Sequence, residues 1–479
     1  MPTTYDGQTV SRRKLLLAGA SIASSAWLSP RVLQAATPAK EFKLVAAPAR
    51  ASLVGKPHPD TDVWCYDGQT PGPELRVRQG ERIRVHVENR LPEETTVHWH
   101  GIRLPNAMDG VPHLTQKPIA PGETFSYEFD CIDAGTFWYH PHQRSFVQVG
   151  RGLYGSLIVE EREPVAVDRD VTWLLADWRL LDDASISNDF GNMHDISHNG
   201  RVGNTVTING RVPETFAVRA GERIRLRLIN GANARIFGLD FEGHKPQIIA
   251  LDGQPVEPHA PPNDRVVLGP AMRIDLMLDM SGEPGKRLRV VDRFYRGLEY
   301  RLLDLVYSDA APLRDLANPQ PVRLPANPIP EPDIKNAKRH QVALGGGMMG
   351  SMRTAMLDGK QVDIRTLMHN GLVWAINGIA AKGHVHEPLV TFDRNRSYIL
   401  ELVNETMWDH PIHLHGHSFR VISRNGKPTQ HREWQDTVLL SRQEKAEVAF
   451  VADNPGDWMI HCHILEHQAG GMMGVVRVA

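Results

Sequence analysis

Histidine gathers in four short motifs near the two ends of the chain. His98-Trp99-His100 and His140-Pro141-His142 lie in the first third of the sequence. Near the C-terminus, residues 410–415 contain three histidines, and residues 461–467 contain three more with a cysteine. Imidazole nitrogens bind copper, zinc, iron and nickel in proteins. One His-x-His pair is weak evidence for a metal site, but four such motifs in one chain predict metal binding rather than isolated polar residues in strands.

Sulfur ligands narrow the choice of metal. Cys462, His467 and Met472 belong to one short segment, and His410 supplies a second imidazole. One thiolate, two imidazoles and a weak thioether suit a blue copper site, whereas structural zinc favours more cysteines or a closed set of four ligands. The other histidines of the four motifs have no sulfur partner. Imidazoles alone suit copper that handles dioxygen, although zinc or iron would also accept them.

The order of residues around Cys462 suggests how two metal sites are joined. Successive side chains of a strand point to opposite faces. His461 and His463 are therefore expected on one face and Cys462 on the other. The thiolate can then bind one copper while its two neighbours bind a separate cluster, which gives a short covalent route for electrons. The same alternation predicts same-side pairs in the other His-x-His motifs.

The elements that carry these motifs are predicted to be strands. An alternation of apolar and polar residues, a turn and a second alternation occur at residues 73–89, again at 213–230 and, more weakly, at 388–404. This period of two is typical of half-buried strands. Two further segments, 133–140 and 454–461, each lead from a turn into a strand that ends in histidine. Self-similarity at a domain-sized interval predicts duplicated domains.

Length and composition agree with several domains. The chain has 479 residues, 41% hydrophobic and 23% charged, and so can form real cores. At ~100–200 residues per domain, roughly two to four domains are expected. We predict an all-β protein with β-sandwich domains at 41–163, 164–310 and 366–479, and a linker containing proline, glycine and methionine at 311–365. A net charge of -2 argues against a nucleic-acid partner, and a mean hydropathy of -0.34 excludes a polytopic membrane protein.

The N-terminus has the pattern of an export signal. Residues 11–14, Ser-Arg-Arg-Lys, open an apolar run that ends near Leu28 and is too short to span a bilayer comfortably, and Ala35-Ala36 offers a cleavage site. The paired arginines resemble the twin-arginine type of signal, which exports folded proteins. We expect residues 1–36 to be removed and the mature protein to be periplasmic, without a stable membrane span. An uncleaved membrane anchor is the alternative.

The four histidine motifs resemble those of the multicopper oxidases, the family of laccases and cuprous oxidases, over nearly the whole mature chain. The resemblance implies three cupredoxin-like Greek-key β-sandwich domains, with a trinuclear copper cluster between the first and the third, and four copper ions per chain. By position, the type 1 copper takes His410, Cys462, His467 and, axially, Met472; the type 2 copper takes His98 and His413; and the type 3 pair takes His100, His140, His142, His415, His461 and His463. Met473 is a competing axial ligand, but the family spacing favours Met472.

The implied reaction couples one-electron oxidation of a reducing substrate to the four-electron reduction of dioxygen to water, with electrons passing through Cys462. By resemblance, His467 is the edge that faces the substrate. Asp109 matches an acid that assists dioxygen reduction in the family; its alternative role is that of a turn residue, because Asp-Gly favours turns. Some bacterial members have a second acid where this chain has Gln468, so that Glu466 or water must carry those protons here.

The identity of the substrate depends mainly on methionines. Met348, Met349, Met352 and Met356 lie before the third domain, and three of them would share a face if the segment were helical. Thioethers prefer Cu(I), and a Met-rich insertion at about this place resembles that of cuprous oxidases. A flexible loop or core-filling side chains explain the cluster as well. The donor can therefore be a phenol, an aromatic amine or a metal ion such as Cu(I), Fe(II) or Mn(II). Four residues are candidates for lining the substrate approach: Glu405, Met407, Trp408 and Asp409.

For several features the sequence is compatible with two interpretations. Cys65 and Cys131 can form a disulfide in an oxidising compartment or remain two buried thiols. His384 and His386 suggest a surface loop, with accessory metal binding as the alternative. A non-catalytic periplasmic copper-binding or scaffold protein of cupredoxin-like fold is the main alternative function, and the intact ligand set argues against it. A copper nitrite reductase would not need all the histidine pairs, and a copper-storage protein would bind copper without oxygen uptake.

Overall fold

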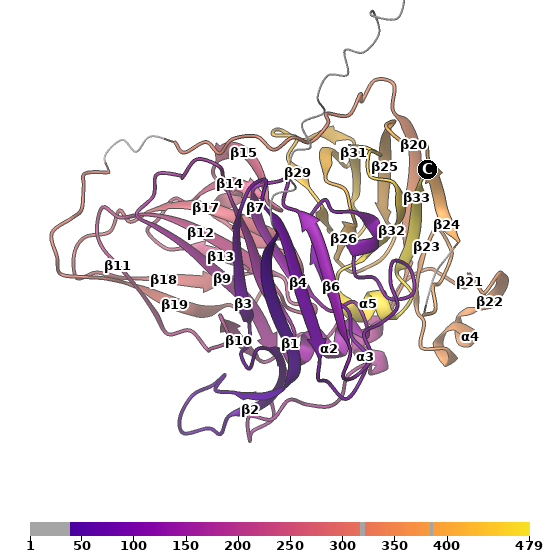
Figure 1. Cartoon of the computed structure of the whole chain (residues 1–479), viewed down its shortest axis with the longest axis horizontal. Helices are drawn as coiled ribbons and strands as arrows, with labels where there is room; N and C mark the ends of the chain where they lie inside the picture. The colour runs from indigo at the N-terminus through magenta and orange to yellow at the C-terminus, as the bar shows by residue number, and fades with distance from the viewer. Residues whose placement is uncertain (1–38, 317–320, 384–386) are drawn as a thin grey trace, which may run out of the picture. The chain divides into compact units, whose positions relative to one another are not determined.

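The computed structural model describes residues 39–316, 321–383 and 387–479. Within these ranges the chain forms strands that pair into sheets, with only short helices between them, which confirms the all-β prediction (Figure 1). No helix in the described ranges has the length and apolar character needed to cross a bilayer. The predicted export signal at residues 1–36 and the predicted loop at His384 and His386 lie outside the described residues.

The strands of residues 40–160 form a first pair of sheets. The orders are β2-β1-β4-β6 and β3-β8-β7-β5. Apolar side chains of both sheets, such as Val85 and Phe137, lie in one core. The strands are β1 (Lys40–Ala51), β2 (Thr61–Tyr66), β3 (Gly72–Arg78), β4 (Arg82–Asn89), β5 (His98–His100), β6 (Thr124–Asp130), β7 (Gly135–His140) and β8 (Gly155–Glu160).

The strands of residues 169–307 form a second pair of sheets. The orders are β10-β9-β12-β17-β14-β15 and β11-β19-β18-β13-β16, and Leu226 and Leu303 pack in the core that they share. The strands are β9 (Arg169–Trp178), β10 (Thr205–Ile208), β11 (Thr215–Val218), β12 (Arg223–Asn230), β13 (Phe237–Phe241), β14 (Gln247–Leu251), β15 (Gln254–His259), β16 (Val266–Leu268), β17 (Arg273–Asp279), β18 (Arg287–Asp292) and β19 (Tyr300–Tyr307).

The strands of the C-terminal part form a third pair of sheets and a hairpin. The orders are β23-β20-β25-β31-β27-β28, with β29 paired to β27, and β24-β33-β32-β26-β30; β21 pairs with β22. The strands are β20 (Lys338–Gly346), β21 (Thr354–Leu357), β22 (Lys360–Asp363), β23 (Trp374–Ile376), β24 (Pro388–Phe392), β25 (Ser397–Asn404), β26 (His410–Leu414), β27 (Phe419–Arg424), β28 (Lys427–Pro428), β29 (Trp434–Gln435), β30 (Thr437–Leu440), β31 (Lys445–Val451), β32 (Gly456–Cys462) and β33 (Met473–Val478).

The helices are short and connect strands. Helix α5 contacts both α2 and α3, so that segments from all three pairs of sheets meet beside the last histidine motif (Figure 1). The helices are α2 (Ser145–Gln148), α3 (Met193–Ser197), α4 (Ile364–His369) and α5 (Leu465–Ala469), with 3-10 turns η1 (Asn106–Met108), η2 (Val149–Arg151) and η3 (Pro262–Asp264).

Each repeated sequence segment forms a corner between two sheets. The first strand of the repeat (β3, β11 or β24) lies in one sheet, and the second (β4, β12 or β25) lies in the other sheet of the same pair. Each second strand also pairs in parallel with the strand that opens its pair of sheets, namely β1, β9 or β20. The repeat in the sequence is thus a repeat in topology.

This pairing corrects the predicted linker at 311–365. Residues Lys338–Gly346 form β20, which occupies the place in the third pair that β1 occupies in the first, and β21, β22 and the start of α4 also lie within the supposed linker. The prolines and glycines of the segment obscured the alternation of buried positions in β20. The condition under which three methionines would share a helical face is not met, because Met356 lies in β21 and residues 347–353 contain no helix. The domain boundaries themselves stay a prediction.

One asparagine at the end of the second repeat strand braces the loop that follows. Asn404 Oδ1 accepts from the backbone N–H of Thr406 at 3.0 Å, and its Nδ2 donates to the carbonyls of Trp408 at 2.7 Å and Ser441 at 2.8 Å. Asn89 and Asn230 make the same set of bonds in their own pairs of sheets. In the third pair this brace fixes the turn that leads into His410.

The two cysteines of the first third do not form a disulfide. Cys65 and Cys131 are free and buried. Burial raises the pKa of the Cys65 thiol to about 11 and that of Cys131 to about 12, so both remain protonated at neutral pH.

Candidate metal centre

One cysteine and two histidines of the third pair of sheets converge on a point. Cys462 Sγ, at the end of β32, lies 3.4 Å from His410 Nδ1 and 3.7 Å from His467 Nδ1. The two Nδ1 atoms are 3.1 Å apart. All three side chains are fully buried. The prediction that Cys462 shares a site with His410 and His467 therefore agrees with the geometry.

Hydrogen bonds decide which nitrogen of each imidazole carries the proton. His467 Nε2 lies 2.6 Å from the backbone carbonyl of His198, which can only accept, so this nitrogen is protonated. His410 Nε2 lies 2.8 Å from Thr406 Oγ1, whose hydroxyl can donate to Asn404 Oδ1. Both Nδ1 lone pairs then face one another beside the thiol. Because lone pairs so close repel, the donor set fits a single metal cation between them.

Met472 lies at this site and Met473 lies elsewhere. The backbone N–H of Cys462 donates to the Met472 carbonyl at 3.1 Å, the Met472 N–H donates to the His467 carbonyl at 3.0 Å, and the Met472 side chain is fully buried. Met473 instead packs in an apolar cluster with Val111 and Met459. This packing favours Met472 as the thioether of the Cys462 site.

The other eight motif histidines form a second cluster, at most 5% exposed. Strand pairing assembles it, because His98 lies opposite His140 on β5 and β7, and His413 lies opposite His461 on β26 and β32. His415 Nε2 is 3.1 Å from His461 Nε2, and His463 Nε2 is 3.4 Å from His140 Nε2. The donor atoms form overlapping groups within 4.8 Å: His98, His413 and His415; His98, His100 and His140; and His142, His415 and His461.

The nitrogens of this cluster divide into an outer set and an inner set. Outer nitrogens reach oxygen acceptors: His140 Nδ1 donates to the Pro141 carbonyl, His461 Nδ1 to the Cys462 carbonyl, and His413 Nδ1 to the Asp436 carbonyl. Inner nitrogens without a protein partner include Nε2 of His98, His142 and His413 and Nδ1 of His100. Buried polar atoms are rarely left unpaired. Lone pairs that converge in this way fit cations, and imidazole ligands suit copper.

Burial lowers the pKa at seven of these eight imidazoles and so favours their neutral form. Desolvation, followed by repulsion among neighbouring rings, lowers the pKa of His100, His140, His142, His461 and His463 well below the usual range. Burial also lowers the pKa of His467 to about 3, although its bond to the His198 carbonyl opposes the shift. Neutral imidazole is the metal-binding form of histidine.

The predicted alternation around Cys462 is present. His461 and His463 face the eight-histidine cluster, while the sulfur of Cys462 faces His410 and His467. The two sites are therefore linked by single peptide bonds. Burial raises the pKa of the Cys462 thiol, so a metal that binds there must displace the proton.

Asp109 lies against the cluster rather than in an exposed turn. Its Oδ2 lies 2.9 Å from His415 Nδ1, and its Oδ1 lies 3.2 Å from His98 Nδ1. Burial alone would raise the pKa of this carboxyl, but the two imidazoles lower it well below its usual range. A buried carboxylate that accepts from a histidine directs the opposite ring nitrogen toward a metal.

A second carboxylate, Asp436, was not predicted from the sequence and also lies against the cluster. Its Oδ1 lies 3.2 Å from His100 Nε2 and 3.3 Å from His413 Nδ1. Arg273, on β17 of the second pair of sheets, donates to both oxygens of Asp436 and lies 3.4 Å from Asp252 Oδ1. Asp252 Oδ2 accepts from the backbone N–H groups of Asp436 and Thr437. The one signal for Asp436 in the sequence is an acidic residue shortly before the apolar residues Val438–Leu440.

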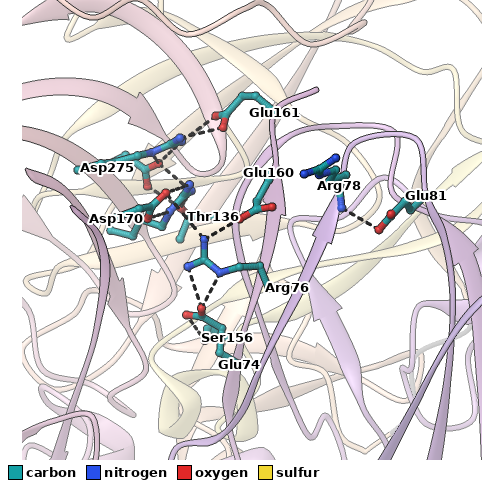
Figure 2. A network of polar contacts seen from close by, with 12 residues as sticks. Glu74, Arg76, Arg78, Glu81, Thr136, Ser156, Glu160, Glu161, Asp170 and Asp275 are labelled. Atoms are coloured by element: carbon teal, nitrogen blue, oxygen red, sulfur yellow. Dashed lines mark hydrogen bonds and ion pairs between the residues drawn. The ribbon is translucent and has the colours of Figure 1, made fainter. Parts of the chain in front are cut away.

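The second pair of sheets supplies none of the motif histidines, yet it braces their cluster. Arg273 Nε donates to the Thr136 carbonyl on β7, and Thr136 Oγ1 donates to Asp275 Oδ1 at 2.6 Å. Figure 2 shows this interface, where Asp275, Asp170 and Glu161 meet arginines of β12. The two hydrogen bonds at Thr136 therefore hold β17, and with it Arg273, against the strand that ends in His140, and the ion pairs with β12 fix Asp275 in place.

A cavity of about 300 Å³ reaches the cluster at His142. Met459, Met473 and Gln468 line it, and the buried Gln468 Oε1 has no hydrogen-bond partner in the described structure. Glu466 is also buried, which raises its pKa, but it accepts from Asn233 Nδ2 and from the Arg201 N–H. Glu466 therefore contacts the second pair of sheets, whereas Gln468 faces the route to His142.

The methionine segment divides into two environments. Met352 packs in an apolar cluster with Ala355 and Leu367, as core-filling residues do. Met348 and Met349 are exposed. Of the residues predicted to line the substrate approach, Trp408 lies near the His467 edge, and Asp409 Oδ1 accepts from the Arg442 N–H.

Comparisons with known proteins agree with this geometry. Sequence profiles described as multicopper oxidase match residues 50–164, 169–295 and 359–479. Multicopper oxidase MmcO of Mycobacterium tuberculosis is 32% identical, over 90% of this chain and 85% of that protein, and copper resistance protein A of Escherichia coli is 25% identical, over 91% and 92%. The crystal structure of a multi-copper oxidase from Pseudomonas thermotolerans has a TM-score of 0.79 at 38% identity, covering 92% of this chain and 100% of that one. The cupredoxin-like fold is confirmed.

Proposed function

Because this chain belongs to the multicopper oxidase family, we propose that its two clusters hold the four copper ions in the family's arrangement. The protein is a copper-dependent oxidoreductase that uses dioxygen and a reducing substrate, and the family assignment does not support a non-catalytic scaffold. The main support for this proposal is that unprotonated ring nitrogens converge in both clusters, as ligands of a metal ion do.

The ligands are proposed residue by residue. The type 1 copper is held by His410, Cys462, His467 and Met472; the type 2 copper by His98 and His413; and the type 3 pair by His100, His140, His142, His415, His461 and His463. In support, His142, His415 and His461 form one tight group, and His140 and His463 face each other on the other side.

Bound copper supplies one-electron transfer from the substrate and the four-electron reduction of dioxygen to water. The protein supplies the rest. Cys462 joins the two sites through the peptide bonds to His461 and His463. Asp109 orients His415 and His98, and we assign it the transfer of protons to the cluster because it is the carboxylate in contact with both rings. The buried walls exclude bulk water.

Copper content and oxygen uptake test this function. Copper-loaded protein is expected to bind four ions, to show a blue type 1 band with type 2 paramagnetic signals, and to consume oxygen when supplied with dimethoxyphenol. Full copper occupancy without oxygen uptake from any donor would identify a copper-storage protein instead.

We further propose export to the periplasm and a role in copper tolerance. The arginine pair at residues 12 and 13 supports twin-arginine export, and a relative named copper resistance protein A supports the role. Replacing both arginines by lysine is expected to retain the protein in the cytoplasmic fraction and to lower the copper tolerance of the host. Periplasmic protein in the Arg12→Lys/Arg13→Lys variant would contradict the proposed export route.

A further inference from the structure

The hairpin of β14 and β15, in the second pair of sheets, packs against the segment that carries Asp436. Its strand β15 contacts β29, the strand directly before Asp436 (Figure 1). At the turn of the hairpin, Asp252 Oδ2 accepts from the backbone N–H groups of Asp436 at 3.1 Å and Thr437 at 3.0 Å. At the end of β15, His259 Nε2 lies 3.0 Å from Glu433 Oε1. The hairpin therefore holds this segment on both sides of β29.

The contacts of His259 require a charged imidazolium. His259 Nδ1 lies 2.8 Å from the backbone carbonyl of Glu257, which can only accept a hydrogen bond, so this nitrogen carries a proton. Nε2 faces the Glu433 carboxylate, which is also an acceptor. A neutral imidazole has a single N–H and can serve only one of these two acceptors, so that its other nitrogen would turn a lone pair toward an oxygen. Protonation of His259 therefore completes the contact with Glu433.

The surroundings of His259 favour its charged form. The hydrogen bond to Glu433 raises its pKa, although partial burial opposes the shift. The ring of His431 stacks on the His259 ring with centroids 4.0 Å apart and an interplanar angle of 12°. The side chains of His259 and Glu433 are only 12% and 22% exposed, so salt screens this pair less than an ion pair at the open surface. Other charges nearby are paired with one another: Arg323 with Glu257, and Arg420 with Glu331.

Asp436 connects this segment to the eight-histidine cluster. Its backbone carbonyl accepts from His413 Nδ1 at 2.9 Å, and its Oδ1 lies 3.2 Å from His100 Nε2. Only the two residues of β29 separate Glu433 from Asp436. Groups that hold a metal-binding imidazole through its other nitrogen orient the ring and tune its affinity for the metal. A contact that fixes Glu433 therefore acts on a proposed type 2 ligand through Asp436.

We propose that His259 and Glu433 form a latch, an ion pair that closes only when His259 is charged, and that the closed latch positions Asp436 and the type 2 ligand His413. The inference rests on the proposed oxidase function and adds two positioning residues outside the four histidine motifs. Below about pH 6.5, the ordinary pKa of histidine, the imidazolium donates to Glu433. As pH rises through the raised pKa of His259, this contact is lost, and the hairpin keeps its contact at Asp252.

Retention of type 2 copper tests the latch. Copper-loaded protein is dialysed against a fixed concentration of chelator at pH 5 and at pH 8, and the type 2 paramagnetic signal gives an apparent dissociation constant. Glu433→Ala should raise this constant about threefold over the wild type at pH 5, as suits an ion pair of modest strength, and leave it unchanged at pH 8. The matched control is Glu41→Ala, because Glu41 Oε2 lies 2.9 Å from His86 Nε2 in the first pair of sheets. This control should match the wild type at both pH values.

A variant with a permanent charge separates the latch from a general loss of packing. His259→Lys is positively charged at both pH values. It should therefore bind type 2 copper about threefold more tightly than the wild type at pH 8, a gain that a poorly folded protein cannot give. The double variant His259→Lys/Glu433→Ala should lose this gain. A dissociation constant of His259→Lys no lower than that of the wild type at pH 8 would overturn the inference.

Hydrogen exchange at the backbone amides of Asp436 and Thr437 gives a readout that needs no copper. At pH 5 these amides should exchange about threefold faster in Glu433→Ala than in the wild type, and at pH 8 the two rates should be equal. The same ratio at both pH values, or an equal effect of Glu41→Ala, would overturn the inference. Absence of type 2 copper from the wild type would refute the proposed oxidase site, whereas amide exchange would still report on the latch.

Discussion

The two metal clusters differ in how they meet the rest of the protein. The eight-histidine cluster lies among all three pairs of sheets and is held by Asp109 from the first, Arg273 from the second and Asp436 from the third. The Cys462 site lies within the third pair, and one hydrogen bond from His467 reaches His198, the half-buried residue after helix α3. A site that reduces dioxygen benefits from closure and fixed ligands, whereas a site that accepts electrons must lie near the surface.

The largest expected effect on oxygen uptake comes from replacing Cys462, which links the two clusters through its peptide bonds. Cys462→Ser removes the thiolate while His461 and His463 remain, so the blue band and oxygen uptake should both be lost although copper stays in the eight-histidine cluster. Copper analysis, absorption spectra and oxygen uptake check this outcome. The matched control is Cys65→Ser, which changes another buried thiol that is not among the proposed metal ligands. Oxygen uptake in Cys462→Ser would show that electrons reach the cluster by another route.

Asp109 tests how the eight-histidine cluster depends on a buried carboxylate. Asp109→Asn keeps the shape of the side chain but removes the charge that faces His415 and His98. Turnover should fall by roughly 10²–10⁴-fold, as is typical for loss of a positioned proton-transfer group, while the blue band persists. Asp358→Asn, in an exposed Asp-Gly turn, is the control. Turnover equal to that of the wild type across the pH range would refute the role.

The Arg273–Asp436 pair tests whether the second pair of sheets supports the cluster. Asp436→Asn removes the carboxylate that the fully buried Arg273 contacts with two nitrogens and leaves only Asp252, 3.4 Å away; breaking a buried pair typically costs about 3–5 kcal/mol. Type 2 copper should bind roughly 10–100-fold more weakly, because Asp436 no longer holds His413, a proposed type 2 ligand, with a charged carboxylate. Asp457→Asn breaks a similar bidentate pair at the surface and should change little. Equal effects of the two variants on copper affinity and stability would contradict the bracing role.

Asp252 gives the smallest expected effect, which depends on pH. Burial, together with the charge of Asp436, raises its pKa from 3.8 to about 7. Between about pH 4 and pH 7 the folded protein therefore holds a proton that the unfolded chain has released, so stability falls as pH rises through this window. Asp252→Asn should reduce that slope.

Urea unfolding at pH 5 and pH 8, in one copper-loading state, measures the Asp252 effect. The midpoint of the wild type should be lower at pH 8 than at pH 5, with a smaller difference in Asp252→Asn. An unchanged difference would place the titrating group elsewhere.

Much of the site could be predicted because the spacing of residues along a single strand decides which side chains share a face. The alternation of a strand alone separates Cys462 from His461 and His463, and the structure has this arrangement. The repeated pairs of strands could be predicted for the same reason, because each shows its own alternation of apolar and polar residues. The linker prediction failed because composition hid β20, whose place depends on its parallel pairing with β25.

The sequence by itself determined the ligand types, their order and the all-β class, since spacing along a strand fixes which side chains share a face. Tertiary structure decided what braces those ligands and where electrons can enter. Arg273 meets Asp436 across 163 residues of sequence, and His467 meets the His198 carbonyl across 269. Nothing in either local sequence specifies these contacts, because they form only when packing removes water and leaves each buried polar group one available partner.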